Sequence, residues 1–262
     1  MPSIIYEFAK KIFRLQRQTV LRLMAYRRID ESFLHDIERI LIIAPHPDDE
    51  IFGCGGLLAG RNDNDKRTDI LFLTNGEASH KDCCTMPKKD IAAMRQRLAI
   101  SASEKLNVPQ ARLHFLDGQD GELPRQDQFG FVNLAEKIAA CLEKLAPEAV
   151  FSPHPFEGWS DHIAAEELIR VAITMLPKRP KLYYYCVWFW HNMPLKKALQ
   201  IDWQRAHLLD ISSRLPLKHQ AMRIYLDALA PCGHPLVGKL PLEILRAFDW
   251  DRELFFEADR AL

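Results

Sequence analysis

Short apolar segments alternate with helical patterns along most of this chain, and that alternation constrains its fold more than any other feature. The apolar segments are residues 39–45, 68–76, 112–118, 148–155 and 181–190. Apolar residues at helical spacing lie between them, at residues 90–106, 132–145 and 161–176. Strands that alternate with helices form a mostly parallel sheet with helices on both faces. The sequence therefore predicts an α/β fold.

Polar clusters follow four of these predicted strands. In chain order they are PHPDDE, TNGEAS, DGQDGE and SPHPFEGWSDH. Rossmann-like sheets of this kind bind their ligands beyond the carboxyl ends of the strands. We therefore expect the four clusters to meet at one rim of the sheet and to form the functional site there.

The first cluster has the composition of half a metal site. His46 and Asp49 are three residues apart directly after a strand, so a tight turn can aim both at one point. Divalent metals favour imidazole and carboxylate ligands, and catalytic zinc combines three protein ligands with one open position for water. Asp48 lies between the two residues and is suited to accept a proton from that water.

The second half of the site is expected after the fourth strand. His162 at the start of a predicted helix supplies the third ligand, and Asp161 beside it can hydrogen-bond a catalytic group or the second ring nitrogen of a ligating histidine. Asp161 alone could be only the N-cap of that helix. A His-x-x-Asp pair alone also occurs often by chance. Two His/Asp clusters at strand ends of one sheet favour a metal site over both simpler explanations.

The glycine-rich segment FGCGGLLAG, residues 52–60, suggests a dinucleotide-binding loop, but two features argue against it. The G-x-G-x-x-G fingerprint requires glycine where this chain has Leu58. The preceding strand also leads into three carboxylates, where a pyrophosphate would have to bind. We expect the glycines to allow close approach of a helix to a strand.

The first 28 residues differ in charge from the rest of the chain. The whole chain of 262 residues has a net charge of zero, which gives no reason to expect a nucleic-acid partner. Residues 1–28 carry a net charge of +6 and are predicted to form an amphipathic helix. Its apolar face is expected to contain Ile5, Phe8, Ile12, Leu15 and Leu23.

This helix is predicted to be an appendage, residues 1–30, on a catalytic domain of residues 31–262. One interpretation places it on an anionic membrane surface as a peripheral contact. The simpler one packs it on the domain or on a second subunit of a homo-oligomer. The sequence leaves both open.

Compartment is suggested by what the chain does not contain. We find no secretory signal and no apolar run of the roughly 20 residues that a membrane helix needs. The six cysteines form no C-x-x-C pair, which favours a reducing, cytoplasmic location, at the inner face of the membrane if the helix binds lipid. The adjacent Cys83 and Cys84 could be redox-active, although two ordinary loop thiols are the simpler interpretation.

The segment APHPDDEIFGCGGLLAG resembles the signature of the LmbE/PIG-L family of zinc-dependent N-deacetylases. The segments LTNGEAS, FLDGQDGEL, SDH and LDISSRLPLKHQAM extend the resemblance from about Arg39 to the C-terminus. It implies a hydrolase that removes the acetyl group from an N-acetylglucosamine-type sugar conjugate. It also implies Zn²⁺ as cofactor, although other divalent metals accept the same ligands.

The family pattern assigns roles to matching residues of this chain. The implied zinc ligands are His46, Asp49 and His162. Asp48 is the implied general base, and Asp161 is the acidic residue that supports a charged catalytic histidine. Arg95 and Asp120 match positions near the sugar hydroxyls.

One departure concerns the catalytic acid. Many members have His-Pro-Asp-His at the second cluster, where this chain has Trp159-Ser160-Asp161-His162. Trp159 cannot transfer protons, so His154 or His191 could substitute. Otherwise zinc alone polarises the carbonyl, and another group protonates the leaving amine. Trp159 could instead stack on a sugar face together with Trp190.

Two alternative functions stay open, and the departure at Trp159 bears on the second. The chain could act on a non-sugar amide, or it could be a non-catalytic sugar- or metal-binding module. Retention of all three ligands and of the base argues against the second alternative.

Overall fold

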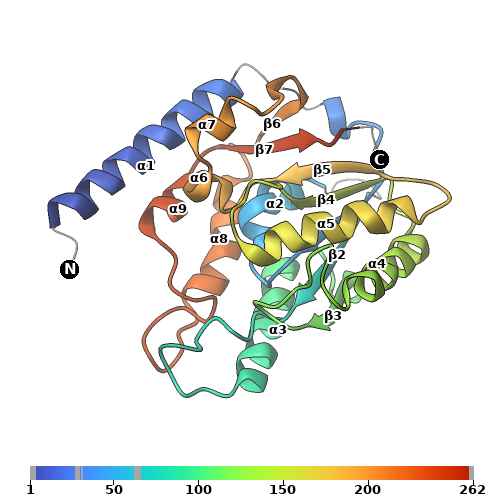
Figure 1. Cartoon of the computed structure of the whole chain (residues 1–262), viewed down its shortest axis with the longest axis horizontal. Coiled ribbons are helices and arrows are strands. Elements are labelled where there is room, and N and C mark those ends of the chain that lie inside the picture. Colours follow the sequence, from blue (N-terminus) through green and yellow to red (C-terminus); the bar gives the residue numbers. More distant parts are fainter. Residues whose placement is uncertain (1–3, 27–29, 31, 62–65, 260–262) are drawn as a thin grey trace.

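The computed structural model describes residues 4–26, 30, 32–61 and 66–259, with side chains from residue 14 onward. A sheet of seven strands in the order β3-β2-β1-β4-β5-β7-β6 forms its centre (Figure 1). The strands are β1 (Arg39–Ala44), β2 (Arg67–Thr74), β3 (Leu113–Gly118), β4 (Ala149–Pro153), β5 (Lys181–Tyr185), β6 (Ala206–Asp210) and β7 (Arg252–Glu257).

The first five strands are parallel, and only β7 runs antiparallel to its neighbours β5 and β6. The predicted α/β class with a mostly parallel sheet is therefore confirmed. From β1 the chain adds β2 and β3 on one side, and it then returns to add β4 on the other side of β1. The topological switch point of the sheet therefore lies between β1 and β4. Crevices at such a switch point are where open α/β sheets bind ligands.

Helices cover both faces of the sheet. The two helices α4 (Phe131–Leu145) and α5 (Ser160–Thr174) pack together on the near face in Figure 1. On the other side, α8 (Leu215–Leu226) contacts both α2 (Asp49–Gly60) and α3 (Lys88–Lys105). The remaining helices are α1 (Ile4–Ala25), α6 (Phe189–Asn192), α7 (Leu195–Ala198) and α9 (Leu242–Ala247), with short 3₁₀ turns at Ser32–Leu34, Gln110–Arg112 and Trp203–Arg205.

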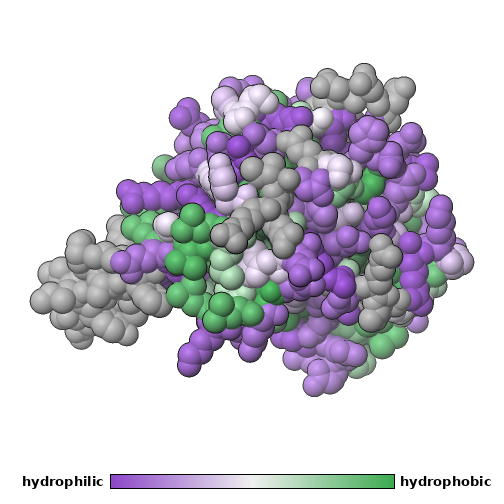
Figure 2. All heavy atoms as spheres, turned by 90° about the horizontal axis from the view of Figure 1, so that it is seen from above, coloured by the Kyte–Doolittle hydropathy of each residue, from purple (hydrophilic) through white to green (hydrophobic). Residues whose placement is uncertain are grey.

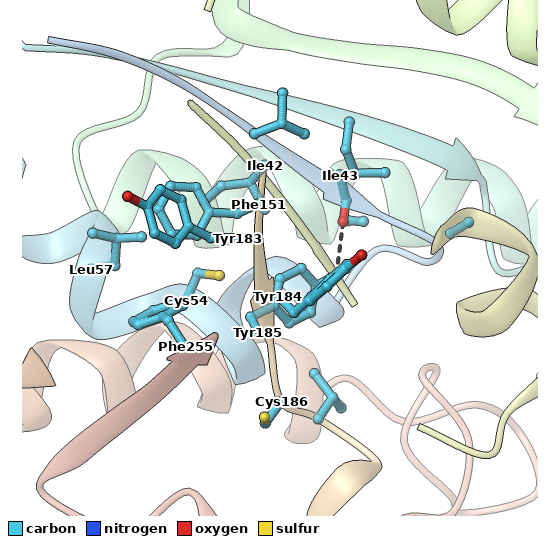
Figure 3. Close-up of a cluster of buried hydrophobic side chains, with 14 of the residues drawn as sticks. Ile42, Ile43, Cys54, Leu57, Phe151, Tyr183, Tyr184, Tyr185, Cys186 and Phe255 are labelled. Carbon is cyan, nitrogen blue, oxygen red and sulfur yellow. Dashed lines mark hydrogen bonds between the residues drawn. The ribbon is translucent and has the colours of Figure 1, made fainter. Parts of the chain in front are cut away.

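The glycines of α2 allow this helix to pack close to the sheet. A Cβ atom at Gly53 would lie 2.3 Å from the ring of Tyr185. That ring is buried, and its hydroxyl donates a 2.8 Å hydrogen bond to the carbonyl of Ile43 in β1 (Figure 3). The close helix–strand approach predicted for the glycine-rich segment is confirmed, and it fixes α2 directly behind the end of β1.

The predicted strand 181–190 is too long. In the structure β5 ends at Tyr185, and the following residues turn into α6. The carboxylate of Glu157 accepts hydrogen bonds from the backbone amides of Val187 and Trp188, so these amides are not available to a neighbouring strand. An acceptor 30 residues upstream therefore ends the strand, and the local apolar pattern cannot reveal it.

The N-terminal helix is observed, and the described part of it packs on the domain. Leu21 and Ala25 are fully buried in the main core, and Gln18 Nε2 donates a 2.9 Å hydrogen bond to the carbonyl of Glu243. Leu23, predicted on the apolar face, is instead 67% exposed. The side chains of Ile5, Phe8 and Ile12 lie outside the described residues.

Seen from above, the described part of the molecule is largely hydrophilic, with hydrophobic atoms gathered in an area left of centre (Figure 2). Of the helices that the structure describes, none is both long enough and apolar enough to span a bilayer. The boundary near residue 30, the membrane contact and the homo-oligomer all stay predictions.

Candidate metal centre

A tight turn after β1 positions the first two predicted ligands. The backbone amide of His46 donates a 3.0 Å hydrogen bond to Asp49 Oδ2, and Asp49 begins α2. Asp48, between them, has a φ of 148°, a conformation that non-glycine residues rarely adopt. Such strain persists only where the surrounding structure enforces it, and it is common at functional sites.

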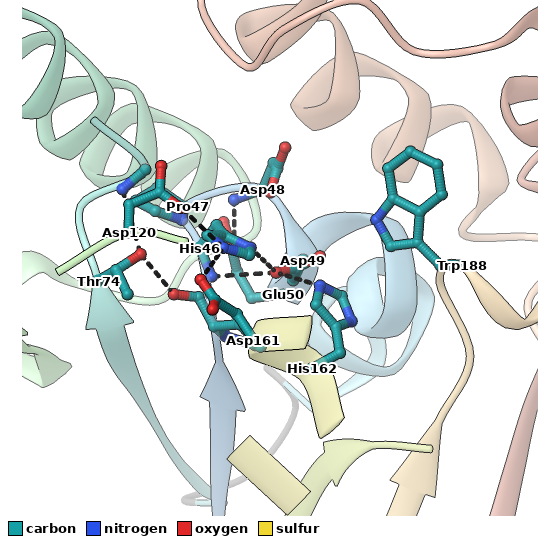
Figure 4. A network of polar contacts seen from close by, with 12 residues as sticks. His46, Pro47, Asp48, Asp49, Glu50, Thr74, Asp120, Asp161, His162 and Trp188 are labelled. Carbon is teal, nitrogen blue, oxygen red and sulfur yellow. Dashed lines mark hydrogen bonds and ion pairs between the residues drawn. The ribbon is translucent and has the colours of Figure 1, made fainter. Parts of the chain in front are cut away.

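The third predicted ligand joins these two from the first turn of α5. His162 Nε2 lies 3.2 Å from Asp49 Oδ2, and His46 Nδ1 lies 3.2 Å from the same oxygen (Figure 4). All three side chains are buried. The structure therefore brings together the three residues predicted as metal ligands, from two segments more than 100 residues apart in the chain.

The atoms of this cluster fit a divalent metal. His162 is completely buried, and neither of its ring nitrogens makes a well-aligned hydrogen bond, although each lies within 3.4 Å of a carboxylate oxygen. An ion between His162 Nε2, His46 Nδ1 and the Asp49 carboxylate would give His162 Nε2 the partner that no hydrogen bond supplies. Two imidazoles and one carboxylate form a donor set of catalytic zinc, and other divalent ions accept it too.

Two further carboxylates hold His46 from its other side. His46 Nε2 lies 3.0 Å from Asp161 Oδ2 and 3.1 Å from Asp120 Oδ1. A proton on Nε2 leaves Nδ1 free to face Asp49, and this is how outer-shell carboxylates orient metal-binding histidines. Asp161 therefore contacts the second ring nitrogen of a candidate metal-binding histidine, which is one of the two positions expected for it. Asp120, expected near sugar hydroxyls, lines the cavity but also pairs with His46.

Sequence reasoning missed Glu157, which lies on the far side of His162. Its carboxylate is completely buried and comes within 3.4 Å of His162 Nδ1. The same carboxylate ends β5, as described above, so its position is fixed by the backbone. The residue lies within the quoted segment SPHPFEGWSDH, but no spacing rule distinguishes it from the other polar residues there.

The electrostatics of the cluster favour a bound cation. Burial by itself would lower the pKa of both histidines, but neighbouring carboxylates raise the pKa of His46 well above its usual value and that of His162 to about 9. The pKa of Asp49 is lowered, because the effect of His162 and His46 outweighs the opposing effect of burial. The carboxylates buried in this region are those of Asp48, Asp49, Glu50, Asp120, Glu157 and Asp161.

The predicted base, Asp48, lies on the cavity wall beside these ligands. Burial raises its pKa to about 7, although Arg95 opposes that rise from 3.3 Å. Arg95 also donates hydrogen bonds of 2.7 Å and 2.9 Å to the carbonyls of Pro47 and Gly76. Arg95 was expected near the sugar hydroxyls. It does line the cavity, but its hydrogen bonds hold the turn that carries Asp48.

Glu50 is a second buried acid that sequence reasoning did not assign. It accepts a 2.5 Å hydrogen bond from the Tyr225 hydroxyl and a 2.9 Å hydrogen bond from the Asp48 amide. Burial raises its pKa to about 8. Glu50 therefore supports the strained backbone of Asp48 from within the protein.

A cavity of about 580 Å³ opens over His46, Asp48 and Asp49, and two stacked indoles form part of its wall. The rings of Trp159 and Trp188 lie 4.8 Å apart at 12°. Trp190, which was expected to pair with Trp159 at the rim, is buried against Trp250 in the core. Because β5 ends early, the chain turns and presents Trp188 to the cavity.

The two histidines considered as substitute acids do not join the cluster. His154 is buried among aromatic rings, and its Nδ1 accepts a hydrogen bond from the amide of Phe156. Burial lowers its pKa to about 3. His191 packs edge-on against Trp188. Neither is among the residues that line the cavity.

Comparison with known proteins places the site in a family context. Residues 41–173 match the family described as GlcNAc-PI de-N-acetylase, PIG-L. A diacetylchitobiose deacetylase of Thermococcus kodakarensis is 30% identical over 138 residues, which is 52% of this chain and 48% of that protein. A probable N-acetyl-α-D-glucosaminyl L-malate deacetylase 2 of Bacillus subtilis is 24% identical over 72% of this chain and 82% of that protein.

Solved structures share the fold over most of the chain. The N,N'-diacetylchitobiose deacetylase of Pyrococcus horikoshii has a TM-score of 0.62 at 19% identity, covering 88% of this chain and 82% of that one. The 4-carboxy-2-hydroxymuconate hydratase GalB of Pseudomonas putida has a TM-score of 0.63 at 16% identity, covering 86% and 98%. The fold alone therefore does not determine the reaction.

Proposed function

The chain belongs to the GlcNAc-PI de-N-acetylase (PIG-L) family, and from that premise we propose that it removes the acetyl group from an N-acetylglucosamine-type sugar conjugate. The observation that carries the proposal is the buried His162, whose Nε2 lies 3.2 Å from Asp49 Oδ2 without a well-aligned hydrogen bond, together with His46 and Asp49 on the wall of the cavity beside Asp48. The names of the two matched relatives, both deacetylases of N-acetylated sugars, support it.

The metal would be held by His46, Asp49 and His162. Zn²⁺ at such a site acts as a Lewis acid toward a carbonyl oxygen and lowers the pKa of water. Asp161 and Glu157 would keep the two imidazoles in the orientation that ligation requires, because each carboxylate lies against the ring nitrogen that faces away from Asp49.

Asp48 is the proposed general base. Water attacks the amide carbon and gives its proton to the Asp48 carboxylate, which Arg95 holds at the cavity wall. The C–N bond then breaks, acetate is released, and the amine leaves with a proton. Because Trp159 cannot supply this proton and His154 lies elsewhere, protonated Asp48 is the donor that this geometry offers.

The indole pair of Trp159 and Trp188 is the proposed platform for the sugar ring. Trp159 is 44% exposed and lies at the start of α5, next to Asp161. Aromatic rings that combine an exposed face with a fixed position bury large apolar area at low entropic cost. A sugar on this face would lie in the cavity that His46 and Asp49 also line.

Release of a primary amine from a panel of N-acetylglucosamine conjugates tests this function. We expect chelator to abolish release from at least one conjugate and added Zn²⁺ to restore it. Release only from non-sugar amides would retain the metal mechanism and overturn the sugar assignment. If protein shown to hold Zn²⁺ releases no amine from the sugar conjugates or from non-sugar amides, the chain is a binding module instead.

The basic N-terminal helix suggests that the conjugate is carried on an anionic membrane, and co-sedimentation with liposomes tests this. Deletion of residues 1–30 would remove Leu21 and Ala25 from the core, so reversal of the charges at Lys10 and Lys11 is the sharper change. We expect weaker co-sedimentation of that variant with anionic liposomes and no binding of either protein to neutral ones. Equal sedimentation of variant and parent on anionic liposomes would contradict the membrane contact.

A further inference from the structure

A second group of metal-ligating side chains lies outside the proposed catalytic cluster. It contains His80, Cys83 and Cys84 from the loop after β2, and Cys232 from the loop after α8. One ligand atom from each residue lies within 4.8 Å of every other. The two loops run side by side in the lower part of Figure 1, although Cys83 and Cys232 are 149 residues apart in sequence.

The backbone of the first loop aligns three of the four side chains. The amides of Cys83 and Cys84 both donate to the carbonyl of His80, at 3.3 Å and 3.4 Å. This is one helical turn, and in such a turn the side chains at positions i, i+3 and i+4 share a face. His80, Cys83 and Cys84 therefore point the same way for a local reason.

The second loop brings the fourth side chain and fixes the histidine. Ser79 Oγ donates to the carbonyl of Leu236 at 2.9 Å, which joins the loops beside the cluster. His80 Nε2 lies 2.9 Å from the carbonyl oxygen of Pro235. A carbonyl can only accept, so the proton of the neutral ring is on Nε2, and the lone pair of Nδ1 faces the thiols. Ligating histidines are oriented in the same way.

The distances suit a tetrahedral ion. His80 Nδ1 lies 3.1 Å from Cys83 Sγ and 3.4 Å from Cys232 Sγ, and the two sulfurs are 3.5 Å apart. Zinc bonds to sulfur and nitrogen at lengths that separate tetrahedral ligand atoms by about 3.5–3.8 Å. Small side-chain movements therefore suffice to admit the ion.

We propose that His80, Cys83, Cys84 and Cys232 form a Cys₃His zinc site that clamps the two loops together. Four protein ligands leave no open position for water, so the site is structural. Binding would release the thiol protons to solvent. His80 and Cys83 line the cavity, as do His234 and Val237 of the second loop, so the clamp would fix one wall of the substrate site.

Cobalt spectroscopy tests the proposal separately from the catalytic cluster, because only a thiolate site gives sulfur-to-cobalt charge-transfer bands. We expect reduced apoprotein titrated with Co²⁺ to show these bands. They should persist in His162→Ala and in the matched control Cys141→Ser, which alters a half-exposed thiol on α4. The double variant Cys83→Ser/Cys232→Ser should lose them. Bands that persist in this double variant, or that are absent from the parent protein, would overturn the site.

Alkylation of the cysteines in the parent protein is a second test, and it does not depend on whether a variant folds. Two equivalents of Zn²⁺, enough to fill both proposed sites, should protect Cys83, Cys84 and Cys232 from alkylation, mapped by mass spectrometry, and should leave Cys141 reactive. Equal labelling of all four with and without Zn²⁺ would contradict the proposal. So would a disulfide between Cys83 and Cys232 in protein purified under reducing conditions, since that bond draws the two sulfurs to about 2.0 Å and removes two ligands.

Discussion

The two candidate metal clusters border the same cavity but differ in donors, support and surroundings. The His46, Asp49 and His162 cluster is buried and is built on the end of β1 and the first turn of α5. The His80, Cys83, Cys84 and Cys232 cluster lies on two loops, and its cysteines are partly or largely exposed. The first has three ligands and an adjacent carboxylate, and the second has four ligands and no base.

The two clusters differ because a catalytic site and a structural site have different requirements. Rigid elements hold ligands more accurately than loops do, and catalysis needs that accuracy together with an open position. Ordering a loop costs conformational entropy, and the binding free energy of a metal can offset that cost. A closed site between two loops therefore stabilises their association. Changes in the first cluster should therefore affect turnover, and changes in the second should affect stability.

Asp48→Asn should have the largest effect. The substitution removes the proposed base and preserves its shape at a strained position where asparagine is tolerated. We expect turnover to fall by about 10²–10⁴-fold, the usual contribution of general base catalysis. Steady-state amine release and metal content measure the outcome. Unchanged metal content is the control, and near-normal turnover would show that Asp48 is not the base.

Glu157→Gln should have a smaller effect, on metal affinity. The amide keeps hydrogen-bonding capacity but loses the charge beside His162 Nδ1. Loss of such an outer-shell partner typically weakens metal binding by about 10–100-fold. Competition with a chelating dye measures it. Glu167→Gln, which alters the partner of Arg125 and lies on α5 with His162, is the control and should bind metal as the parent does.

His154→Asn tests whether burial by itself makes a histidine a ligand. Burial lowers the pKa of His154 to about 3 from an ordinary value of 6.5, so the unfolded chain binds one more proton between these limits. Neutral His154 contributes stability above about pH 6.5 that is lost as the pH falls, at up to about 1.4 kcal/mol per pH unit.

We expect His154→Asn to reduce this slope in urea unfolding of chelator-treated protein. Its metal content before chelation should stay normal. Parallel profiles of variant and parent between about pH 4 and pH 6 would contradict the pKa assignment. Loss of metal in this variant would mean that His154 is itself a ligand.

Cys84→Ser should have the smallest effect on turnover and a measurable effect on stability. The variant loses one ligand of the clamp, so Zn²⁺-loaded protein should unfold at a lower temperature, by about 2–4 °C for each kcal/mol lost. With chelator present, variant and parent should unfold at the same temperature. A difference that survives chelation would show that Cys84 acts through packing and not through a metal.

Most of the fold and the grouping of the candidate ligands could be predicted because their causes are local. Apolar strands followed by helical patterns determine a parallel sheet, and parallel strands place their following loops at one rim. The spacing of His46 and Asp49 is set by one turn, and Asp161 and His162 begin a helix that directly follows a strand. These relations need only a few neighbouring residues, so the sequence determined them without knowledge of the packing.

Which distant groups complete the site depends on the packing of the whole chain. Asp120 and Asp161 meet at one nitrogen of His46, Glu157 ends β5 and so brings Trp188 to the cavity, and Cys232 reaches the cysteines of another loop. Each contact depends on the length and path of a loop, and hydrophobic periodicity carries no information about loops. The physical reason is that side-chain contacts within three or four residues follow from backbone geometry, whereas contacts across the chain follow from the packing of the whole molecule.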